Sequence, residues 1–353
     1  MKKIICLMLV VCMIFCMAAC GKSPAAATHN VTDHAGNIVA VPDEINRIAV
    51  CDIYPLPAML CTLFGESEKI VAMAPQSMAA AKSGLLGELY PEVLSASTGF
   101  LQSGSVNIEE LLALMPDVVF YSVAYPETGE KLKQAGVAAV AVSANKWEYD
   151  AIETTYGWGQ LIGEVLNKQS KAQLIYDYSK SVYNLVQQKT KDVKNKQDLF
   201  FLFQYTETGI MTASKNSFGN WWANAVGANN VAADLTNNNG APTNMEQIYK
   251  YNPSKILITN FTLATPDDIK NNTVGNYDWK PVKAVKNGEI YKMPLGSYRS
   301  YTAGIDTPIT LLWLAKKTYP DLFKNVDIKA ETKGFYKDVM DIELTNEQIN
   351  KMF

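Results

Sequence analysis

Residues 168–196 read KQSKAQLIYDYSKSVYNLVQQKTKDVKNK and contain neither glycine nor proline. Apolar residues recur about every four positions, which is the periodicity of an α-helix with one apolar face. A coiled-coil arm is the alternative, but the stripe is too short and irregular for sustained heptads. We therefore predict a rigid helix over residues 166–196, roughly 43 Å long over the quoted stretch at 1.5 Å per residue. The stripe consists of Leu174, Tyr178, Val182, Val186 and Val193, widened by Ile175 and Leu185.

Short apolar runs lie on both sides of this helix. Continuous apolar strands that alternate with helices are typical of a parallel sheet covered on both faces. We therefore predict an α/β fold class, with one lobe over residues 31–165 and a second over residues 197–353. The predicted strands are residues 47–51 (RIAVC), 70–74 (IVAMA), 118–121 (VVFY), 138–142 (AAVAV), 199–203 (LFFLF), 256–259 (ILIT) and 289–292 (EIYK).

An internal echo supports two related lobes. Residues 107–111 (NIEEL) and 244–248 (NMEQI) each lead through a proline into an apolar run. Each copy is typical of a short capped helix followed by a turn and a strand. Asn107 with Glu110, and Thr243 with Glu246, have the spacing of a capping box.

The N-terminus has the pattern of an export signal. Lys2 and Lys3 precede an uncharged apolar run that is short for a membrane span and suits a signal peptide. The run ends Met17-Ala18-Ala19-Cys20, which resembles the lipobox of bacterial lipoproteins, although Met17 replaces the usual leucine. We predict a signal peptide over residues 1–19, a lipid on Cys20 and a tether over residues 20–30. Ordinary secretion with an incidental Cys20 is the alternative.

Two cysteines, Cys51 and Cys61, remain in the exported body. A disulfide is possible outside the cytoplasm, but both residues lie in apolar segments, which favours two buried free thiols.

Composition excludes several kinds of site. The formal net charge is −3, which gives no electrostatic case for nucleic-acid binding. The only two histidines, His29 and His34, lie near the start of the body, so a site built from several histidines is excluded. Of the 32 basic residues only Arg47 and Arg299 are arginine. No enzyme motif such as GxSxG or HExxH is present, and an exported enzyme with a carboxylate pair is the remaining enzymatic alternative.

Several segments together resemble one family. Residues 31–41 (VTDHAGNIVAV), followed by Pro42 and Arg47-Ile48, look like the opening of the iron-complex substrate-binding proteins of bacterial ABC importers. Residues 107–120 (NIEELLALMPDVVF), 278–280 (DWK) and 285–291 (VKNGEIY) match other recurrent segments of that family, in order. The resemblance implies two Rossmann-like lobes joined by one backbone helix, and only a small movement on ligand binding.

The resemblance also implies partners. In that family one glutamate per lobe pairs with arginines of the membrane permease, and the matching residues here are Glu109 and Glu246. Each also has a structural explanation as a carboxylate at a helix N-terminus. The expected partners are therefore an ABC permease with its ATPase, and the membrane through Cys20, for a monomeric protein outside the cytoplasm.

Ligands of two-lobed α/β proteins bind in the cleft, at loops that follow the carboxyl ends of strands. Arg299 in such a loop could pair with a carboxylate or another oxyanion, and a structural bridge to Asp306 is the alternative. Trp221 and Trp222 begin a helix on which one tryptophan could face the cleft and the other the core. The predicted ligand-binding residues are Tyr54, Tyr125, Trp147, Trp221, Trp222, Tyr298, Arg299 and Tyr301.

The expected ligand is a metal complex rather than a bare ion, because histidines are so few. A ferric siderophore is favoured, and haem, a cobamide or a small oxyanion are alternatives. No catalytic residue, resident metal or cofactor is expected.

Overall fold

The computed structural model describes residues 27–102, 104–169 and 171–353. The predicted signal peptide, the lipidation site Cys20 and most of the predicted tether lie outside these residues. The last residues of the predicted tether are instead part of a strand, because β1 (Thr28–Thr32) pairs antiparallel with β2 (Ile38–Pro42). No helix among the described residues has the length and apolar character needed to cross a membrane.

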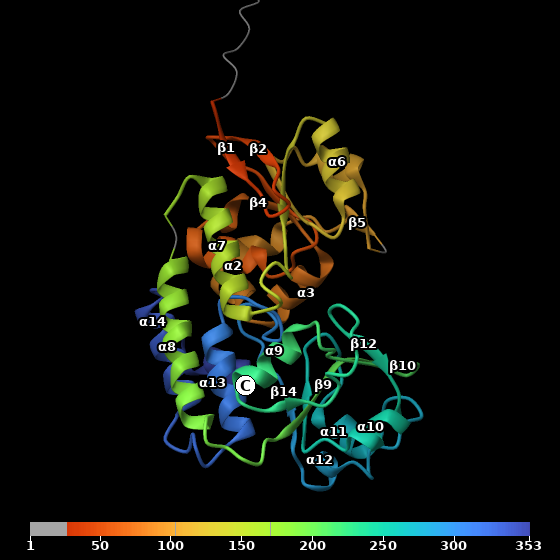
Figure 1. Ribbon diagram of the computed structural model, residues 1–353. Coiled ribbons are helices and arrows are strands. Elements are labelled where there is room, and N and C mark those ends of the chain that lie inside the picture. Colours follow the sequence, from red (N-terminus) through yellow and green to blue (C-terminus); the bar gives the residue numbers. More distant parts are fainter. Residues whose placement is uncertain (1–26, 103, 170) are drawn as a thin grey trace, which may run out of the picture.

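The first lobe is a four-stranded parallel sheet in the order β4-β3-β7-β8 (Figure 1). Alternate residues of its strands point to opposite faces, so Val118 and Phe120 pack on one side and Val119 and Tyr121 on the other. Helices cover both faces, which explains why the strands are apolar throughout. The strands are β3 (Ile48–Val50), β4 (Ile70–Met73), β7 (Val118–Ser122) and β8 (Ala138–Val142), with a small hairpin of β5 (Leu101–Gln102) and β6 (Ser105–Val106). The helices are α2 (Leu56–Phe64), α3 (Pro75–Ser83), α4 (Leu86–Leu89), α5 (Ile108–Ala113), α6 (Pro126–Gln134) and α7 (Ala151–Leu166).

The second lobe has a mixed sheet in the order β12-β10-β9-β13-β14, with β11 beside β9. The central strands β9, β13 and β14 are parallel, and the β9–β10 hairpin is antiparallel. The strands are β9 (Asp198–Thr206), β10 (Gly209–Thr212), β11 (Asn229–Asn230), β12 (Ala241–Thr243), β13 (Lys255–Ile258) and β14 (Ile290–Lys292). The helices are α9 (Phe218–Ala225), α10 (Met245–Tyr251), α11 (Pro266–Asn271), α12 (Lys283–Lys286), α13 (Thr307–Thr318), α14 (Ile328–Asp338) and α15 (Asn346–Met352). The predicted α/β fold class and each of the seven predicted strands are therefore confirmed.

The connecting helix is shorter than the prediction. It is α8 (Ala172–Thr190), which spans roughly 28 Å and packs against both α7 and α13 (Figure 1). The preceding helix α7 ends because Asn167 adopts a left-handed conformation with φ 49°, which asparagine tolerates better than most residues. The link between the lobes is thus a pair of adjacent helices rather than one helix over residues 166–196.

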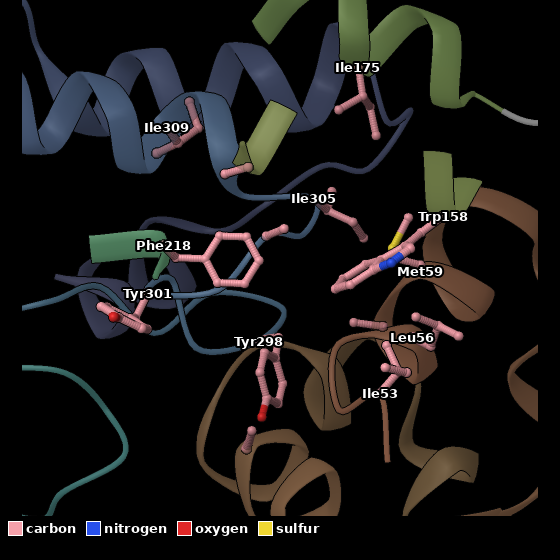
Figure 2. Close-up of a cluster of buried hydrophobic side chains, with 14 of the residues drawn as sticks. Ile53, Leu56, Met59, Trp158, Ile175, Phe218, Tyr298, Tyr301, Ile305 and Ile309 are labelled. Atoms are coloured by element: carbon pink, nitrogen blue, oxygen red, sulfur yellow. The ribbon is translucent and has the colours of Figure 1, made fainter. Parts of the chain in front are cut away.

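One apolar cluster runs across the boundary between the lobes. It joins the inner faces of both sheets through α2, α7, α8, α9 and α13. In Figure 2, side chains from the two lobes surround the space between them: Ile53, Leu56, Met59 and Trp158 from the first lobe, and Phe218, Tyr298, Tyr301, Ile305 and Ile309 from the second. The outer faces carry two separate clusters, one per lobe. The shared cluster packs the two lobes together and includes Ile53, Tyr298 and Tyr301 from the loops that follow β3 and β14.

The two cysteines, Cys51 and Cys61, are buried and free, as predicted. Burial raises the pKa of both thiols, so they are inert small apolar residues of the first lobe.

Candidate functional site

The carboxyl ends of the parallel strands in both lobes point to the boundary between them. A loop of the second lobe, residues 293–301, follows β14 and reaches the first lobe, where the Gly296 carbonyl accepts a hydrogen bond from the Leu85 N–H (2.9 Å). A Cβ on Gly84 would lie 2.6 Å from the same carbonyl oxygen, so only glycine allows this close approach. Pro55 and Ala58 line a cavity of about 10 Å³ together with residues 297–300 and 302–307, which is room for about one water molecule.

Arg299 lies half-buried in this loop with no countercharge. Its guanidinium carbon is 4.6 Å from the centre of the Phe261 ring and 5.9 Å from that of Tyr298, both cation–π distances. Among the described residues no carboxylate oxygen lies within 4 Å of its nitrogens. The charge of Arg299 is therefore held between aromatic rings and left free for another group.

Asp306 is not the partner of Arg299, so that structural alternative is wrong. The fully buried Asp306 carboxylate accepts hydrogen bonds from the Ser297 N–H (2.8 Å) and hydroxyl (2.7 Å) and from the Tyr336 hydroxyl (2.5 Å). Burial raises the pKa of Asp306, and these three donors oppose that shift. Asp306 thus anchors the beginning of the Arg299 loop to α14.

Two hydroxyl groups beside Arg299 have no partner. The Tyr298 hydroxyl and the Ser300 Oγ are buried and make no hydrogen bond within the described part of the chain. Burial raises the pKa of Tyr298, so its proton stays available for donation. Buried polar groups are nearly always satisfied, and unsatisfied ones need an explanation. The Arg299 side chain lies close enough to the Tyr298 hydroxyl to oppose the rise in its pKa, and these three polar groups have no other hydrogen-bond partner among the described residues.

The first lobe contributes Asp52, which follows β3. Its Oδ2 is buried without a hydrogen-bond partner, and burial raises the pKa of the carboxyl to about 6. Tyr54, two residues on, is half-buried and lies within electrostatic range of Asp52, Tyr125 and Arg299. The two lobes therefore bring a carboxyl group and a guanidinium to the same cleft.

Replacing Asp52 by asparagine should make the protein more stable at neutral pH. The pKa of Asp52 is raised in the folded state, so folding takes up a proton, and the stability associated with this group falls as pH rises from about 4 to about 6. We expect Asp52→Asn to exceed wild type by about 2–3 kcal/mol at pH 7 and to match it at pH 3.5, in denaturant unfolding. A stability difference that is the same at both pH values would contradict this.

The other predicted ligand-binding residues lie in different places. Tyr125 is 43% exposed at the rim of the first lobe. Tyr301 and Trp222 are fully buried, and the Trp222 Nε1–H donates to the Tyr301 carbonyl (2.7 Å) while the Tyr301 hydroxyl accepts from the Gly219 N–H (3.2 Å). The expectation that these two side chains contact the ligand is therefore not met, because both are buried. They lie in the core and support the Arg299 loop from there.

The two remaining tryptophans do not join Arg299. Trp147 is half-buried and packs edge-on against His34, with ring centres 5.2 Å apart. Trp221 is half-buried and lines a separate cavity of about 560 Å³ between the lobes. This cavity is rich in amide side chains and is also lined by Asn145, Glu148, Tyr149, Lys215, Asn216, Ser217, Asn220, Asn224 and Asn238.

Sequence reasoning missed Asn260, Phe261 and Ser300. Asn260 and Phe261 follow β13, where the sequence reads Thr-Asn-Phe-Thr-Leu-Ala, and the Asn260 Oδ1 is also buried without a partner. The only available signal was their position after a predicted strand. Ser300 lies in the same loop as Arg299, but no role was predicted for it.

Neither histidine is available to a ligand. His29 bonds to Asp43 (2.8 Å) and to the Glu164 carbonyl (2.9 Å), and Asp43 raises its pKa. His34 bonds to the Ser143 N–H, and burial lowers its pKa to about 4. Within residues 27–102, 104–169 and 171–353, no three His, Cys, Asp or Glu side chains lie together in a way that could hold a metal ion.

Glu109 and Glu246 occupy equivalent positions in the two lobes. Each is the second residue of a short helix, is exposed, and follows an asparagine N-cap: the Asn107 side chain accepts from the Glu110 N–H, and Asn244 from the Gln247 N–H. The predicted cap Thr243 is therefore wrong by one residue, because Asn244 has the extended conformation of an N-cap and makes the bond. Glu246 also pairs with Lys250 one helical turn away (2.9 Å).

Comparison with known proteins gives consistent results. A family model described as "Periplasmic binding protein" matches residues 62–295, about two-thirds of the chain. The molybdate-binding protein MolA of Haemophilus influenzae is 24% identical over 92% of this chain and 94% of its own. An uncharacterised ABC transporter substrate-binding lipoprotein of Bacillus subtilis, YvrC, is 27% identical over 62% of this chain and 67% of its own. The crystal structure of a periplasmic solute-binding protein from Veillonella parvula superimposes with a TM-score of 0.80 and 29% identity, covering 93% of this chain and 97% of that one.

Proposed function

Because this chain belongs to the periplasmic binding protein family, we propose that it captures an oxygen-rich anion between its lobes for import. It is a substrate-binding protein of an ABC importer and not an enzyme. It acts outside the cytoplasm and hands its ligand to a permease driven by an ATPase. The nature of the ligand and the residues that bind it are the substance of the proposal.

The main support for an anionic ligand is the group of hydrogen-bond donors around Arg299, for which the described residues provide no carboxylate partner. A guanidinium without a carboxylate partner and two buried hydroxyls without acceptors support a ligand that supplies oxygen acceptors. The Phe261 and Tyr298 rings lie 4.6 and 5.9 Å from the guanidinium carbon and favour a cation at this place. Tyr54 of the first lobe lies within electrostatic range of Arg299 and could add a hydroxyl donor, and Tyr125 lies near Tyr54.

A small oxyanion is the first candidate. The relative MolA is named for molybdate, a compact oxyanion, although the cavity beside Arg299, about 10 Å³, has room for only about one water molecule in this structure. A ferric siderophore is the second candidate, supported by the larger cavity between the lobes that Trp221 lines, where this ring could pack against a chelate. Haem and a cobamide are further possibilities of this second kind.

A thermal-shift screen of the purified protein tests the ligand class. We expect molybdate or tungstate to stabilise the protein by about 2.7 kcal/mol at a hundredfold excess over Kd. Sulfate and phosphate test whether the site discriminates among oxyanions. Ferric siderophores, haem and cobamides test the second candidate, a metal complex. Stabilisation by a neutral sugar or a peptide, with no response to any anion or metal complex, would overturn the proposal.

The protein is proposed to be a monomer held at the membrane by a lipid on Cys20. The Met-Ala-Ala-Cys pattern supports this, as does the relative YvrC, which is named a lipoprotein. Replacing Cys20 by serine should move the protein from the membrane fraction to the medium or periplasm, in fractionation followed by immunoblotting. A membrane-bound Cys20→Ser protein would show that a lipid at this residue is not the anchor.

A further inference from the structure

Lys292, the last residue of β14, directs its ammonium group at one turn of the backbone. The Nζ donates to the carbonyl oxygens of Thr259 (3.0 Å), Thr262 (2.7 Å) and Ala264 (2.9 Å). These three bonds use all three donors of a lysine ammonium. Within the described chain no carboxylate oxygen lies within 4 Å of this nitrogen. The charge of Lys292 is therefore committed to the turn formed by residues 259–264.

This turn needs polar bonds because apolar burial does not hold its tip. Leu263, at the tip, is 98% exposed. On the side facing β9, the Thr259 hydroxyl donates to the Phe203 carbonyl (2.6 Å) and the Thr262 hydroxyl to the Tyr205 carbonyl (2.9 Å). Lys292 binds the turn from the opposite side, through three carbonyl oxygens that accept no other hydrogen bond from the described residues.

The turn carries Phe261, whose ring lies against the Arg299 guanidinium (4.6 Å). Phe261 also packs against Tyr301, with ring centres 6.3 Å apart, so its place depends on where the turn sits relative to the core. We infer that Lys292 is a positioning residue of the ligand site: it holds the turn 259–264 so that Phe261 lies against Arg299. This inference rests on the proposed function only in treating Arg299 as the ligand-binding group.

The charges around Lys292 make this arrangement sensitive to pH. Burial, and then the nearby Arg299, lower the pKa of Lys292 to about 8, and Asp268 on α11 opposes the shift. Lys316 and Lys317 on α13, and Asp327 and Lys329 at the start of α14, line a cavity of about 580 Å³ with it. As pH rises through about 8 the ammonium loses a proton, and the neutral amine has two donors for three carbonyls. The turn should then loosen.

Arginine chemistry offers a test that needs no ligand. Arg47 and Arg299 are the only arginines in the chain, so phenylglyoxal modification followed by peptide mass mapping reports each separately. In Lys292→Met we expect Arg299 to react roughly two- to fivefold faster than in wild type, the effect of losing one exposed cation–π contact. Arg47, whose Nε donates to the Leu114 carbonyl (2.8 Å), should react at the same rate in both proteins.

Lys317→Met is the matched control. Lys317 is half-buried, lines the same cavity and has a pKa lowered by burial, but it lies over the Tyr291 ring and does not touch the turn. Its replacement should leave the Arg299 rate unchanged. An equal Arg299 rate in wild type and Lys292→Met, or the same increase in Lys317→Met, would overturn the inference.

The pH profile separates positioning from general stability. The ratio of the Arg299 rate to the Arg47 rate should rise through about pH 8 in wild type and stay flat in Lys292→Arg, whose cation does not titrate there. Lys292→Arg also serves if Lys292→Met fails to fold. Molybdate is the binding probe: if wild type does not bind it but the reactivity changes as expected, the oxyanion proposal fails while the role of Lys292 stands.

Discussion

Replacing Arg299 by methionine should weaken anion binding by about 2–5 kcal/mol, the usual effect of removing one partner of a desolvated, hydrogen-bonded charge pair. Methionine retains the apolar contact with Phe261 and removes only the charge and its donors. Because Arg299 has no ion pair in the unliganded protein, thermal stability without ligand should change little. Isothermal titration with molybdate measures the affinity, and the unliganded melting temperature confirms folding.

Arg47, the other arginine, supplies the matched control for this substitution. It precedes β3, its Nε donates to the Leu114 carbonyl (2.8 Å), and its own N–H donates to Asp117 (2.8 Å). Arg47→Met should lower stability by about 1 kcal/mol and leave affinity unchanged. If Arg299→Met binds molybdate and every other ligand found in the screen as tightly as wild type, Arg299 is structural and the site lies elsewhere.

Reversing the charge of both Glu109 and Glu246 to lysine should abolish uptake and leave ligand affinity intact. Both carboxylates are exposed, one on each lobe, and neither lines a described cavity between the lobes. Charges at the rim of an interface mainly set orientation and association rate. The family resemblance implies that these two carboxylates face arginines of the permease, so two lysines in their place should repel it. Uptake of radiolabelled ligand by cells that carry the double variant measures the effect.

The control for the charge reversal uses two other exposed glutamates that lie at the beginning of short helices. Glu110, next to Glu109, and Glu347 on α15 are also exposed, so the double variant Glu110→Lys and Glu347→Lys changes the net charge equally. It should support normal uptake. Uptake by the Glu109→Lys and Glu246→Lys protein at the wild-type rate would remove these residues from the permease interface, whatever the ligand is.

The sequence predicts the sheets well because both are buried on two faces. Continuous apolar runs such as residues 118–121 and 199–203 are too short for a buried helix and fit a strand that is covered on both faces. The connecting helix was overextended because residues 167–171 (NKQSK) contain neither glycine nor proline, so no helix breaker marks the place where Asn167 ends one helix before the next begins. Periodicity alone does not detect a change of helix axis.

The site was predictable only as a set of loops. Arg299 stood out because arginine is so rare in this chain, and its place after a strand put it in the cleft. Trp221 and Trp222 are adjacent on a helix, so their side chains must point in different directions, but helical geometry does not determine which of them faces inward. The hydrogen bond from Trp222 to the Tyr301 carbonyl decides it, and that contact joins residues 79 positions apart. Phe261 was missed for a similar reason, since its role comes from a turn held by Lys292.

The apolar cluster shared by the lobes has a consequence for how the protein melts. Phe201 and Leu257 on the inner face of the second sheet belong to the same contact network as Val118 and Phe120 of the first. Neither lobe can unfold without exposing the apolar surface of the other, so the two lobes form one cooperative unit. Heating should produce a single calorimetric transition whose van't Hoff and calorimetric enthalpies agree. A ligand that binds loops of both lobes, as proposed, should then raise the melting temperature of the whole molecule.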